Sequence, residues 1–446
     1  MSASTVSTPL TAATLSPRWF NAHGADRLLG LFAVVEPGEG TGALLLSLNV
    51  FLLLAAYYLL KTVREVFVLT EGGAEVKAYS AAGQALLLLL VVPIYGWLGR
   101  HLVRFRLIAF VNLFFVANLL GFYFASFSGW QIGVAFYLWL GIFNVMTVAQ
   151  FWSFANDLYS EEAGKRLFPV LGIGSSLGAL AGAKAAGSFF AALGIDQLLL
   201  LAGSLLLMSL ALSWWVNRRA CDSCPVQRMN AAAPTGVQNG FTLVSHSRYL
   251  RLIAIMVMLV NVVNTGGEFL LSKLVLQEAA NAGIAGIKAQ EAFIGHFYGE
   301  YFTWVGVLGL LFQLFLVSRL FKWIGVRGAL FLLPTIALGA YSVLAALPAL
   351  SVAFTGKVCE NAADYSVENT AKHALFLPLS RDVKYQAKTA IDTFFFRAGD
   401  MSQAGIVWLG SLWAFTPRHF ALLNVTLVAT LIGVVTILAR SKPVAD

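Results

Sequence analysis

The chain has 446 residues, of which 59% are hydrophobic and only 12% are charged, and its mean hydropathy is +0.77. This composition excludes a soluble globular protein and predicts a protein that lies in a lipid bilayer. The formal net charge of +8 gives no reason to expect a nucleic acid partner. Most of the basic residues fall in the breaks between apolar segments, where they set membrane orientation.

Residues 1–41 form a Ser/Thr-rich tail without the basic region, apolar core and cleavage site of a signal peptide. We expect a partly disordered cytosolic tail. Apolar windows of about 20 residues, long enough to cross ~30 Å of hydrocarbon, follow from Gly42 onward. They predict twelve spans, with approximate ends at 42–60, 80–99, 107–127, 130–156, 167–193, 195–216, 249–275, 300–320, 326–347, 350–375, 389–413 and 419–439.

The predicted spans form two similar sets. Residues 42–216 hold the first six spans, a polar and basic linker covers 217–248, residues 249–440 hold the last six, and 441–446 form a short tail. Asn49 and Lys61 in the first span have the same separation as Asn261 and Lys273 in the seventh. We therefore predict an all-α integral membrane protein of two pseudo-repeated six-helix halves, the major-facilitator-like architecture, with its substrate site between the halves. The Lys and Arg distribution predicts that both termini are cytoplasmic.

Charged side chains inside the predicted spans are the candidate site residues, because each costs at least about 2.5–3.5 kcal/mol at bilayer depth. The basic candidates for substrate binding are Lys61, Arg64, Lys184, Lys273, Lys357 and Lys388. The acidic candidates for coupling or charge balance are Glu268, Glu360, Asp364, Asp392 and Asp400. Converging Lys and Arg side chains favour an organic anion, above all one with phosphate groups. The alternative is that these charges form pairs that only hold the bundle together.

Helical spacing groups several of these charges on common faces. Lys357, Glu360, Asp364 and Glu368 follow one another at three, four and four residues, which predicts one stripe that does not face lipid. Lys388, Asp392, Asp400 and Gln403 share one side of the eleventh span, and Arg397 lies toward the other side but within i+3 reach of Asp400. Lys184 stands alone beside a ridge of Gly174, Gly178 and Gly182 that is suited to close helix packing.

The charges after the first apolar run divide into two sets. We interpret Lys61, Arg64 and Glu65 as charges at the outward end of the central cavity, with Glu65 pairing a base. Gly72 and Gly73 are turn formers, so Glu71, Glu75 and Lys77 are expected in a short external loop.

No catalytic residue, metal ligand or cofactor is expected. "GIGSSLG" lacks the Lys-Ser/Thr pair of a phosphate-binding loop, and no metalloprotease or nucleophile motif occurs. "CDSC" in the linker has the spacing of half a zinc site but no second pair. We therefore expect a monomeric transporter rather than an enzyme, driven by gradients or by exchange.

Three segments resemble signatures of the bacterial and plastid ATP/ADP translocases: "YYLLKTVREVFVLTEGGAE", "QFWSFANDLYSEEAGKRLFPVLGIGSSLGA" and "SRDVKYQAKTAIDTFFFRAGD". The resemblance implies twelve helices, a major-facilitator-like fold and nucleotide exchange across a bacterial inner membrane. Matched by motif, Arg64, Lys61 and Lys388 correspond to positions associated with nucleotide recognition, and Glu268 and Lys273 match a Glu and a Lys of the family's seventh helix.

The sequence departs from this pattern in the fourth span. The family's functionally important acidic residue falls on Leu140, and the polar residues between Leu140 and Phe151 are Asn144, Thr147 and Gln150. Two alternatives to nucleotide exchange stay open. One is a proton-coupled permease for another anion that uses Glu268, Glu360 or Asp364 as its relay. The other is a membrane scaffold or sensor with a transporter fold, docking partners through its basic linker.

Overall fold

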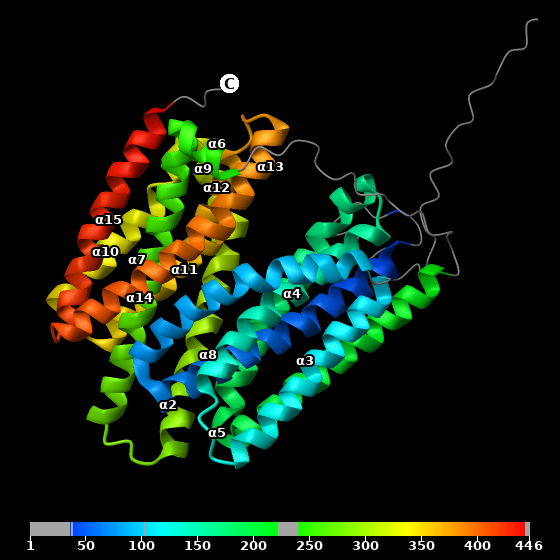
Figure 1. Cartoon of the computed structure of the whole chain (residues 1–446), viewed down its shortest axis with the longest axis horizontal. Coiled ribbons are helices and arrows are strands. Elements are labelled where there is room, and N and C mark those ends of the chain that lie inside the picture. Colours follow the sequence, from blue (N-terminus) through cyan, green and yellow to red (C-terminus); the bar gives the residue numbers. More distant parts are fainter. Residues whose placement is uncertain (1–35, 37–38, 102–103, 222–239, 442–446) are drawn as a thin grey trace, which may run out of the picture.

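The computed structural model describes residues 36, 39–101, 104–221 and 240–441, and every regular element in these ranges is a helix (Figure 1). The fold class predicted from composition is therefore confirmed as all-α. The expectations for the tail 1–41, for the middle of the linker 217–248 and for the C-terminal tail fall mainly outside the described residues.

Four helices form an N-terminal group: α2 (Gly40–His101), α3 (Arg104–Phe127), α4 (Gly133–Leu158) and α5 (Glu161–Cys221). Two of them are long and each is broken at one glycine, α2 at Gly73 (φ 75°) and α5 at Gly194 (φ 71°). This left-handed backbone conformation is accessible to glycine at no steric cost. Figure 1 shows that the chain of α2 turns back on itself between its two parts.

The C-terminal group contains the remaining elements. They are α6 (Gly240–His246), α7 (Arg248–Asn281), α8 (Ile287–Leu311), η1 (Phe312–Leu316), α9 (Val317–Ala329), α10 (Leu332–Ala346), α11 (Leu350–Ala363), η2 (Asp364–Glu368), α12 (Asn369–Leu375), α13 (Arg381–Ala390), η3 (Ile391–Phe395), α14 (Phe396–Leu412) and α15 (Pro417–Arg440). The η segments are single π-helical turns, which occur often at functional sites. One of them, η2, begins at Asp364 and ends at Glu368 of the predicted charged stripe.

Seven helices of the described chain are long and apolar enough to cross a membrane. Three of these have at least twice the ~20 residues of one crossing: Gly40–Trp97 has 58 residues, Glu162–Arg218 has 57 and Ile287–Ala329 has 43. The architecture is thus that of a multi-pass membrane protein. The predicted count of twelve separate spans is not confirmed by these helices.

The glycine ridge beside Lys184 packs as predicted. A Cβ atom built on each of the three glycines would lie 2.2–2.5 Å from a backbone oxygen of α2, a distance that no real Cβ contact reaches. The contacting pairs are Gly174 with Ser47, Gly178 with Phe51, and Gly182 with Ala55. Only glycine lets α5 approach the first part of α2 so closely.

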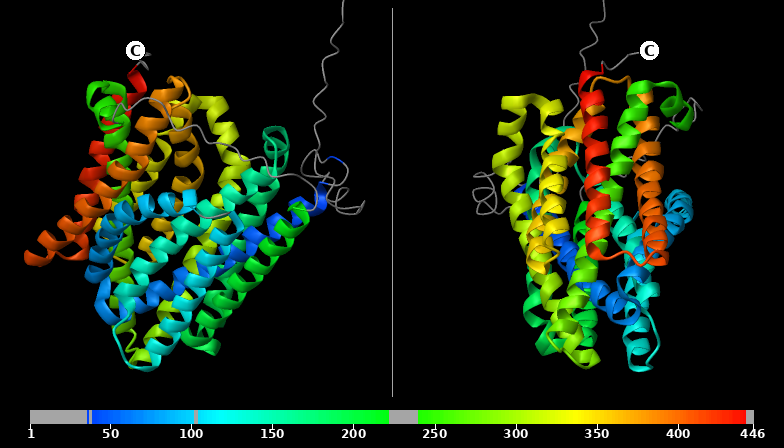
Figure 2. Two further views of the ribbon diagram at one scale, coloured as in Figure 1. Left: turned by 45° about the vertical axis from the view of Figure 1, so that its right-hand side comes forward. Right: turned by 90° about the vertical axis from the view of Figure 1, so that its left-hand side faces the viewer.

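The two groups meet through a few helix pairs, α5 with α8 and α2 with α7, α8 and α14. From this contact region the ribbons of the two groups spread apart toward the end that carries the C terminus (Figures 1 and 2). Polar side chains cross between the groups where α2 meets α7.

Candidate functional site

Lys77 lies at the centre of a buried network that joins α2 to α7. Its Nζ is 2.6 Å from Glu65 Oε2 and 3.7 Å from Glu268 Oε2, and it donates a hydrogen bond of 2.8 Å to Ser272 Oγ. The side chains of Lys77 and Glu65 are 7% and 1% exposed. Since Glu268 and Ser272 belong to α7, Lys77 links the two groups of helices.

The expectation that residues 71–77 form an external loop is wrong. The turn takes a single residue, Gly73, and the helix resumes at once, so that Lys77 points back toward Glu65 instead of into water. Sequence reasoning missed Lys77 for this reason. The available signal was the apolar run that begins directly after Lys77, which leaves too little chain for a loop.

Arg64 and Lys61 lie beside this network on the same helix. Arg64 forms an ion pair with Glu65, as the sequence predicted, and its Nε donates at 3.1 Å to Glu65 Oε1. The guanidinium carbon of Arg64 lies 4.4 Å from the ring centroid of Tyr137. Lys61 Nζ lies 4.2 Å from the ring centroid of Phe302 on α8. Aromatic faces attract both cations, by about 0.5–2 kcal/mol each.

Glu268 receives hydrogen bonds from two groups that the sequence did not single out. Tyr301 Oη donates to Glu268 Oε1 at 2.8 Å, and Asn361 Nδ2 donates to the same oxygen at 2.9 Å. Asn361 also donates to Tyr301 Oη at 2.7 Å. A carboxylate with these donors and with Lys77 nearby is held in one position. Buried tyrosines within an apolar run carry no distinguishing pattern, so Tyr301 could not be singled out from the sequence.

Lys273 pairs across the groups as well. Its Nζ is 3.0 Å from Glu75 Oε1, and the two side chains are 25% and 36% exposed. The ring centroids of Phe269 and Phe420 lie 5.5 and 5.7 Å from the ammonium group. This pair lies in the same contact between α2 and α7 as the Lys77 network, but it is more open to solvent.

The charged stripe of the tenth predicted span is largely buried. Lys357 Nζ is 3.2 Å from Glu360 Oε1 and donates to Asn264 Oδ1 at 2.8 Å. Glu360 also accepts a hydrogen bond of 2.5 Å from Tyr341, and Asp364 accepts one of 3.3 Å from Asn264. The stripe therefore faces α7 and α10 at its start, as its spacing predicted.

The same stripe ends at a cavity of about 380 Å³ lined by Asp364, Glu368, Lys372 and neighbouring apolar residues. Glu368 is buried, and its Oε2 has no hydrogen-bond partner in the part of the chain that the structure describes. Lys372 instead pairs with Asp392 at 3.2 Å.

The remaining candidates form separate clusters of charged side chains. Arg397 pairs with Asp400 at 3.3 Å, as the i+3 spacing predicted, and Asp400 accepts a hydrogen bond of 2.8 Å from Asn261. Lys388 is half-buried on α13, close enough to His373 to act on it electrostatically.

Lys184 pairs with Glu300 of α8 at 2.5 Å, and its side chain is 56% exposed. Of the six basic candidates, Lys61 and Arg64 lie beside Glu65 of the Lys77 network on α2, and Lys357 lies near Glu268 of the network on the opposite side. Lys273 lies at the same helix contact.

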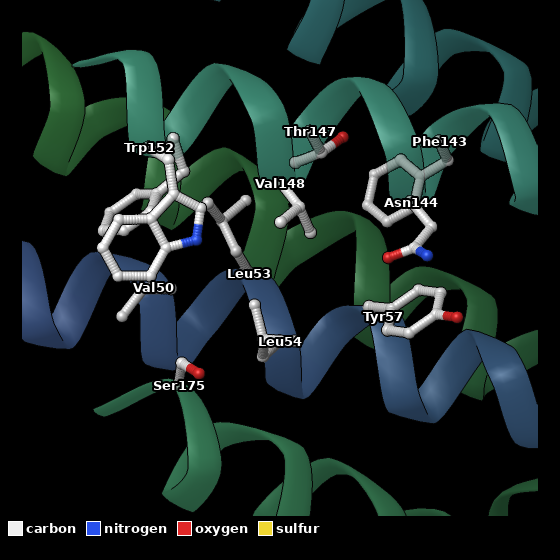
Figure 3. A pocket seen from close by; sticks show the side chains of 11 residues that line it. Val50, Leu53, Leu54, Tyr57, Phe143, Asn144, Thr147, Val148, Trp152 and Ser175 are labelled. Carbon is white, nitrogen blue, oxygen red and sulfur yellow. The ribbon is translucent and has the colours of Figure 1, made fainter. Parts of the chain in front are cut away.

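Leu140 is fully buried on α4, where it packs within the aromatic core that includes Phe136 and Phe143. Leu140 is thus a core residue and does not line a polar cavity. One turn further along α4, Asn144 lines a pocket between helices of the N-terminal group (Figure 3).

A family model described as the TLC ATP/ADP transporter matches residues 117–441 of the chain. Among curated proteins, ADP,ATP carrier protein 1 of Chlamydia pneumoniae is 24% identical over 320 residues, which cover 61% of this chain and 60% of that carrier. ADP,ATP carrier protein 1 of Chlamydia trachomatis serovar D is 22% identical over 317 residues, covering 61% and 58%. The match thus spans about 60% of the length of these curated relatives.

Solved structures of transporters share the fold. A POT family transporter in complex with 5-aminolevulinic acid superposes with a TM-score of 0.63 at 13% identity, covering 90% of this chain and 96% of that one. A bacterial homologue of the iron transporter ferroportin in an inward-facing state gives a TM-score of 0.62 at 14% identity, covering 90% and 98%. The nucleoside transporter NupG gives 0.59 at 13% identity, covering 89% and 98%. At these identities the likeness is one of fold, which is the major-facilitator type.

Proposed function

The chain belongs to the TLC ATP/ADP transporter family, and from this premise we propose that it is a secondary transporter that exchanges nucleotides of the ATP and ADP type across a bacterial inner membrane. Transport would proceed by alternating access of a site between the two groups of helices, without an enzymatic step. The observation that carries the proposal is the position of Lys77 between Glu65 of one group and Glu268 of the other. The relatives named as ADP,ATP carriers support the choice of substrate.

We propose that the protein crosses the membrane twelve times, in two six-helix halves at 42–216 and 249–440, with both termini cytoplasmic. The positive-φ glycines Gly73, Gly194 and Gly325 support this count, because each interrupts a helix at a break between two predicted spans. Gly40–Trp97 and Glu162–Arg218 would then each contribute two crossings.

In the proposed mechanism, nucleotide phosphates replace carboxylates around a shared set of cations. Arg64, Lys61 and Lys273 would contact phosphate oxygens together with Lys77, and Glu268 would balance these charges when no substrate is bound. Removal of one partner from a buried ion pair costs about 3–5 kcal/mol, so the groups are held together until an anion compensates the cations. Reorientation of the protein without bound nucleotide would require the same free energy to separate the ion pairs, which is a physical basis for obligatory exchange.

The other candidates receive different proposed roles. Lys388, beside His373, would form a second basic cluster in the C-terminal group that meets the nucleotide away from the Lys77 network. The pairs that Lys184 and Lys357 form with Glu300 and Glu360 support a role in holding the bundle together. Asp392 and Asp400 would balance Lys372 and Arg397 in the same way.

The decisive test is counterflow in proteoliposomes loaded with ADP and supplied with labelled ATP outside. We expect uptake that requires internal nucleotide and that is abolished by Arg64→Ala, since this change removes the phosphate-binding guanidinium beside Glu65. Arg319→Ala is the matched control, because Arg319 is exposed and its contacts among the described residues are with Phe315 one turn earlier, a hydrogen bond to the carbonyl oxygen and a contact with the ring. Uptake of another anion without counterflow of any nucleotide would overturn the choice of substrate.

A second candidate function, a proton-coupled permease for a different anion, is favoured by Glu368. Glu368 lines the same cavity as Asp364, and its buried Oε2 has no hydrogen-bond partner among the described residues. Buried carboxyl groups of this kind serve as proton carriers in transporters. An uncoupler separates the two functions. It should collapse proton-driven uptake, whereas one-for-one nucleotide exchange should continue.

A further inference from the structure

Two adjoining cavities lie around the first turns of α11, and the Lys77 network uses none of the residues that line them. The first cavity, of about 690 Å³, lies between α7, α8 and the start of α11, and its polar lining includes Gln277, Glu278 and Asn281 of the last turns of α7. The second cavity, of about 490 Å³, lies between α10 and α11. Ser351 and Thr355 of α11 line both cavities, so the two form one continuous space.

The second cavity is an apolar groove on the surface of the C-terminal group. Ile336 and Val343 of α10 line it, and Val343 is 52% exposed. A Cβ atom built on Gly339, which also lines the groove, would meet no other atom within 4 Å, so the groove is open at this point. The hydroxyl of Thr355 donates to the carbonyl oxygen of Ser351 in its own helix at 3.0 Å and needs no partner from outside. Hydrocarbon chains of the surrounding bilayer therefore fit this groove.

The polar cavity lies at one end of the molecule and the groove leads from it toward the middle. Figure 1 shows that the loop from α7 to α8 lies at the end opposite to the C terminus, and Glu278 is close before this loop. From Leu350 at the polar cavity to Cys359 in the groove, α11 rises by about 13 Å. A polar site at the membrane surface that continues into an apolar groove at hydrocarbon depth matches the shape and polarity of a phospholipid.

Glu278 determines which headgroup fits the polar cavity. Its side chain is exposed and has no ion-pair partner among the described residues, and no Lys or Arg lines either cavity. The carboxylate attracts an ammonium group and repels a headgroup with net negative charge. Gln277 and Asn281 add carboxamide N–H donors for phosphate or ester oxygens. We propose that the two cavities form a binding site for a bilayer phospholipid whose headgroup carries a primary ammonium group.

The site belongs to the C-terminal group alone, because all its lining residues come from α7, α8, α10, α11 and the turn before α11. A bound lipid therefore leaves the contact between α2 and α7 intact. With the C terminus on the cytoplasmic side, as proposed above, the lipid comes from the outer leaflet of the membrane.

The headgroup is tested by native mass spectrometry of the purified full-length protein, titrated with dioleoyl phosphatidylethanolamine or dioleoyl phosphatidylglycerol. The two lipids have the same acyl chains, and we expect the ethanolamine lipid to bind about fivefold more tightly, because only its headgroup pairs with Glu278. Glu278→Gln should reduce this preference to less than about twofold. Glu291→Gln is the matched control, since Glu291 lies on α8 near the same end and lines neither cavity.

The groove is tested by filling it. Gly339→Phe places a ring in the open space and should weaken binding of both lipids about tenfold, because part of an acyl chain loses its apolar contact. Gly433→Phe on α15 is the matched control, since a Cβ atom built on Gly433 also meets no atom within 4 Å and Gly433 lines neither cavity. The melting temperature of each variant in detergent shows whether it is folded.

Several results would overturn the lipid site. Equal binding of the two lipids by the wild-type protein, or an unchanged preference in Glu278→Gln, contradicts recognition of the ammonium group. Wild-type affinity in Gly339→Phe contradicts a lipid in the groove. Glycerophosphoethanolamine has the headgroup but no acyl chains, and its displacement of the lipid at equal concentration would assign the cavity to a soluble amine instead. None of these measurements involves a nucleotide, so their failure leaves the proposed function untouched.

Discussion

The first part of α2 and the helix α7 carry the same two side chains at the same separation, an asparagine and, twelve residues later, a lysine. Each asparagine binds within its own group of helices: Asn49 Nδ2 donates at 2.7 Å to Ser213 Oγ, and Asn261 Nδ2 donates at 2.8 Å to Asp400 Oδ1.

Each lysine instead reaches the other group of helices. Lys61 lies over the ring of Phe302, whereas Lys273 pairs with Glu75. The repeat thus gives two cations at the contact between the groups but two different partners. Lys61 can accept an anionic ligand without giving up a carboxylate, while Lys273 must release Glu75 first. This difference predicts a substrate-binding role for Lys61 and a closing role for Lys273.

The largest effect should come from Lys77, which lies between Glu65 and Glu268. Lys77→Met leaves Glu65 and Glu268 without their shared partner, and we expect it to lower the free energy of unfolding by about 3–5 kcal/mol. The measurement is thermal unfolding in detergent, with exposed Lys288→Met as control. Equal melting temperatures for the two variants would contradict the role of Lys77 as the link between the groups.

The next effect should separate Lys61 from Lys273. Lys61→Met is expected to raise the KM for ATP exchange about tenfold, the equivalent of ~1.4 kcal/mol, because it removes a phosphate contact. The melting temperature should change little, since Lys61 gives up a ring contact and not a buried ion pair. A large loss of stability with unchanged KM would reverse the assignment of the two lysines.

A smaller effect is expected for the Lys273 pair. Lys273→Met and Glu75→Gln should each cost up to about 1 kcal/mol, because both side chains are partly exposed, and the double variant should cost no more than either single variant. High salt should reduce the difference from wild type. Unfolding and exchange rates measured at low and high ionic strength test this, and additive effects of the two changes would show that the pair contributes nothing.

The smallest effect should come from Lys184, which pairs with Glu300 at a more exposed position. Lys184→Met is expected to change stability by less than about 0.5 kcal/mol and the exchange rate by less than about twofold. The proteoliposome assay used for Arg64→Ala measures this. A loss of exchange as large as that of Arg64→Ala would show that Lys184 contributes to substrate binding.

Part of the candidate site could be predicted from the sequence. The cost of a charge in a membrane singled out Arg64, Glu268 and Glu360, and helical spacing predicted that the stripe from Lys357 onward faces other helices. Tyr301 and Asn361, which donate hydrogen bonds to Glu268, could not be predicted from the sequence. Within an apolar helix any tyrosine or asparagine fits the pattern, and its role depends on which helix packs opposite.

What the sequence by itself determined is the environment and the class of protein: apolar runs of membrane length, a repeated arrangement of polar residues, and motifs of one transporter family. These features are local, because hydropathy, helical periodicity and motif identity depend on neighbouring residues of one chain segment. The tertiary structure decided which charges are partners. Lys77 belongs to the site only because the chain reverses within one residue at Gly73 and thereby brings Lys77 between Glu65 and α7.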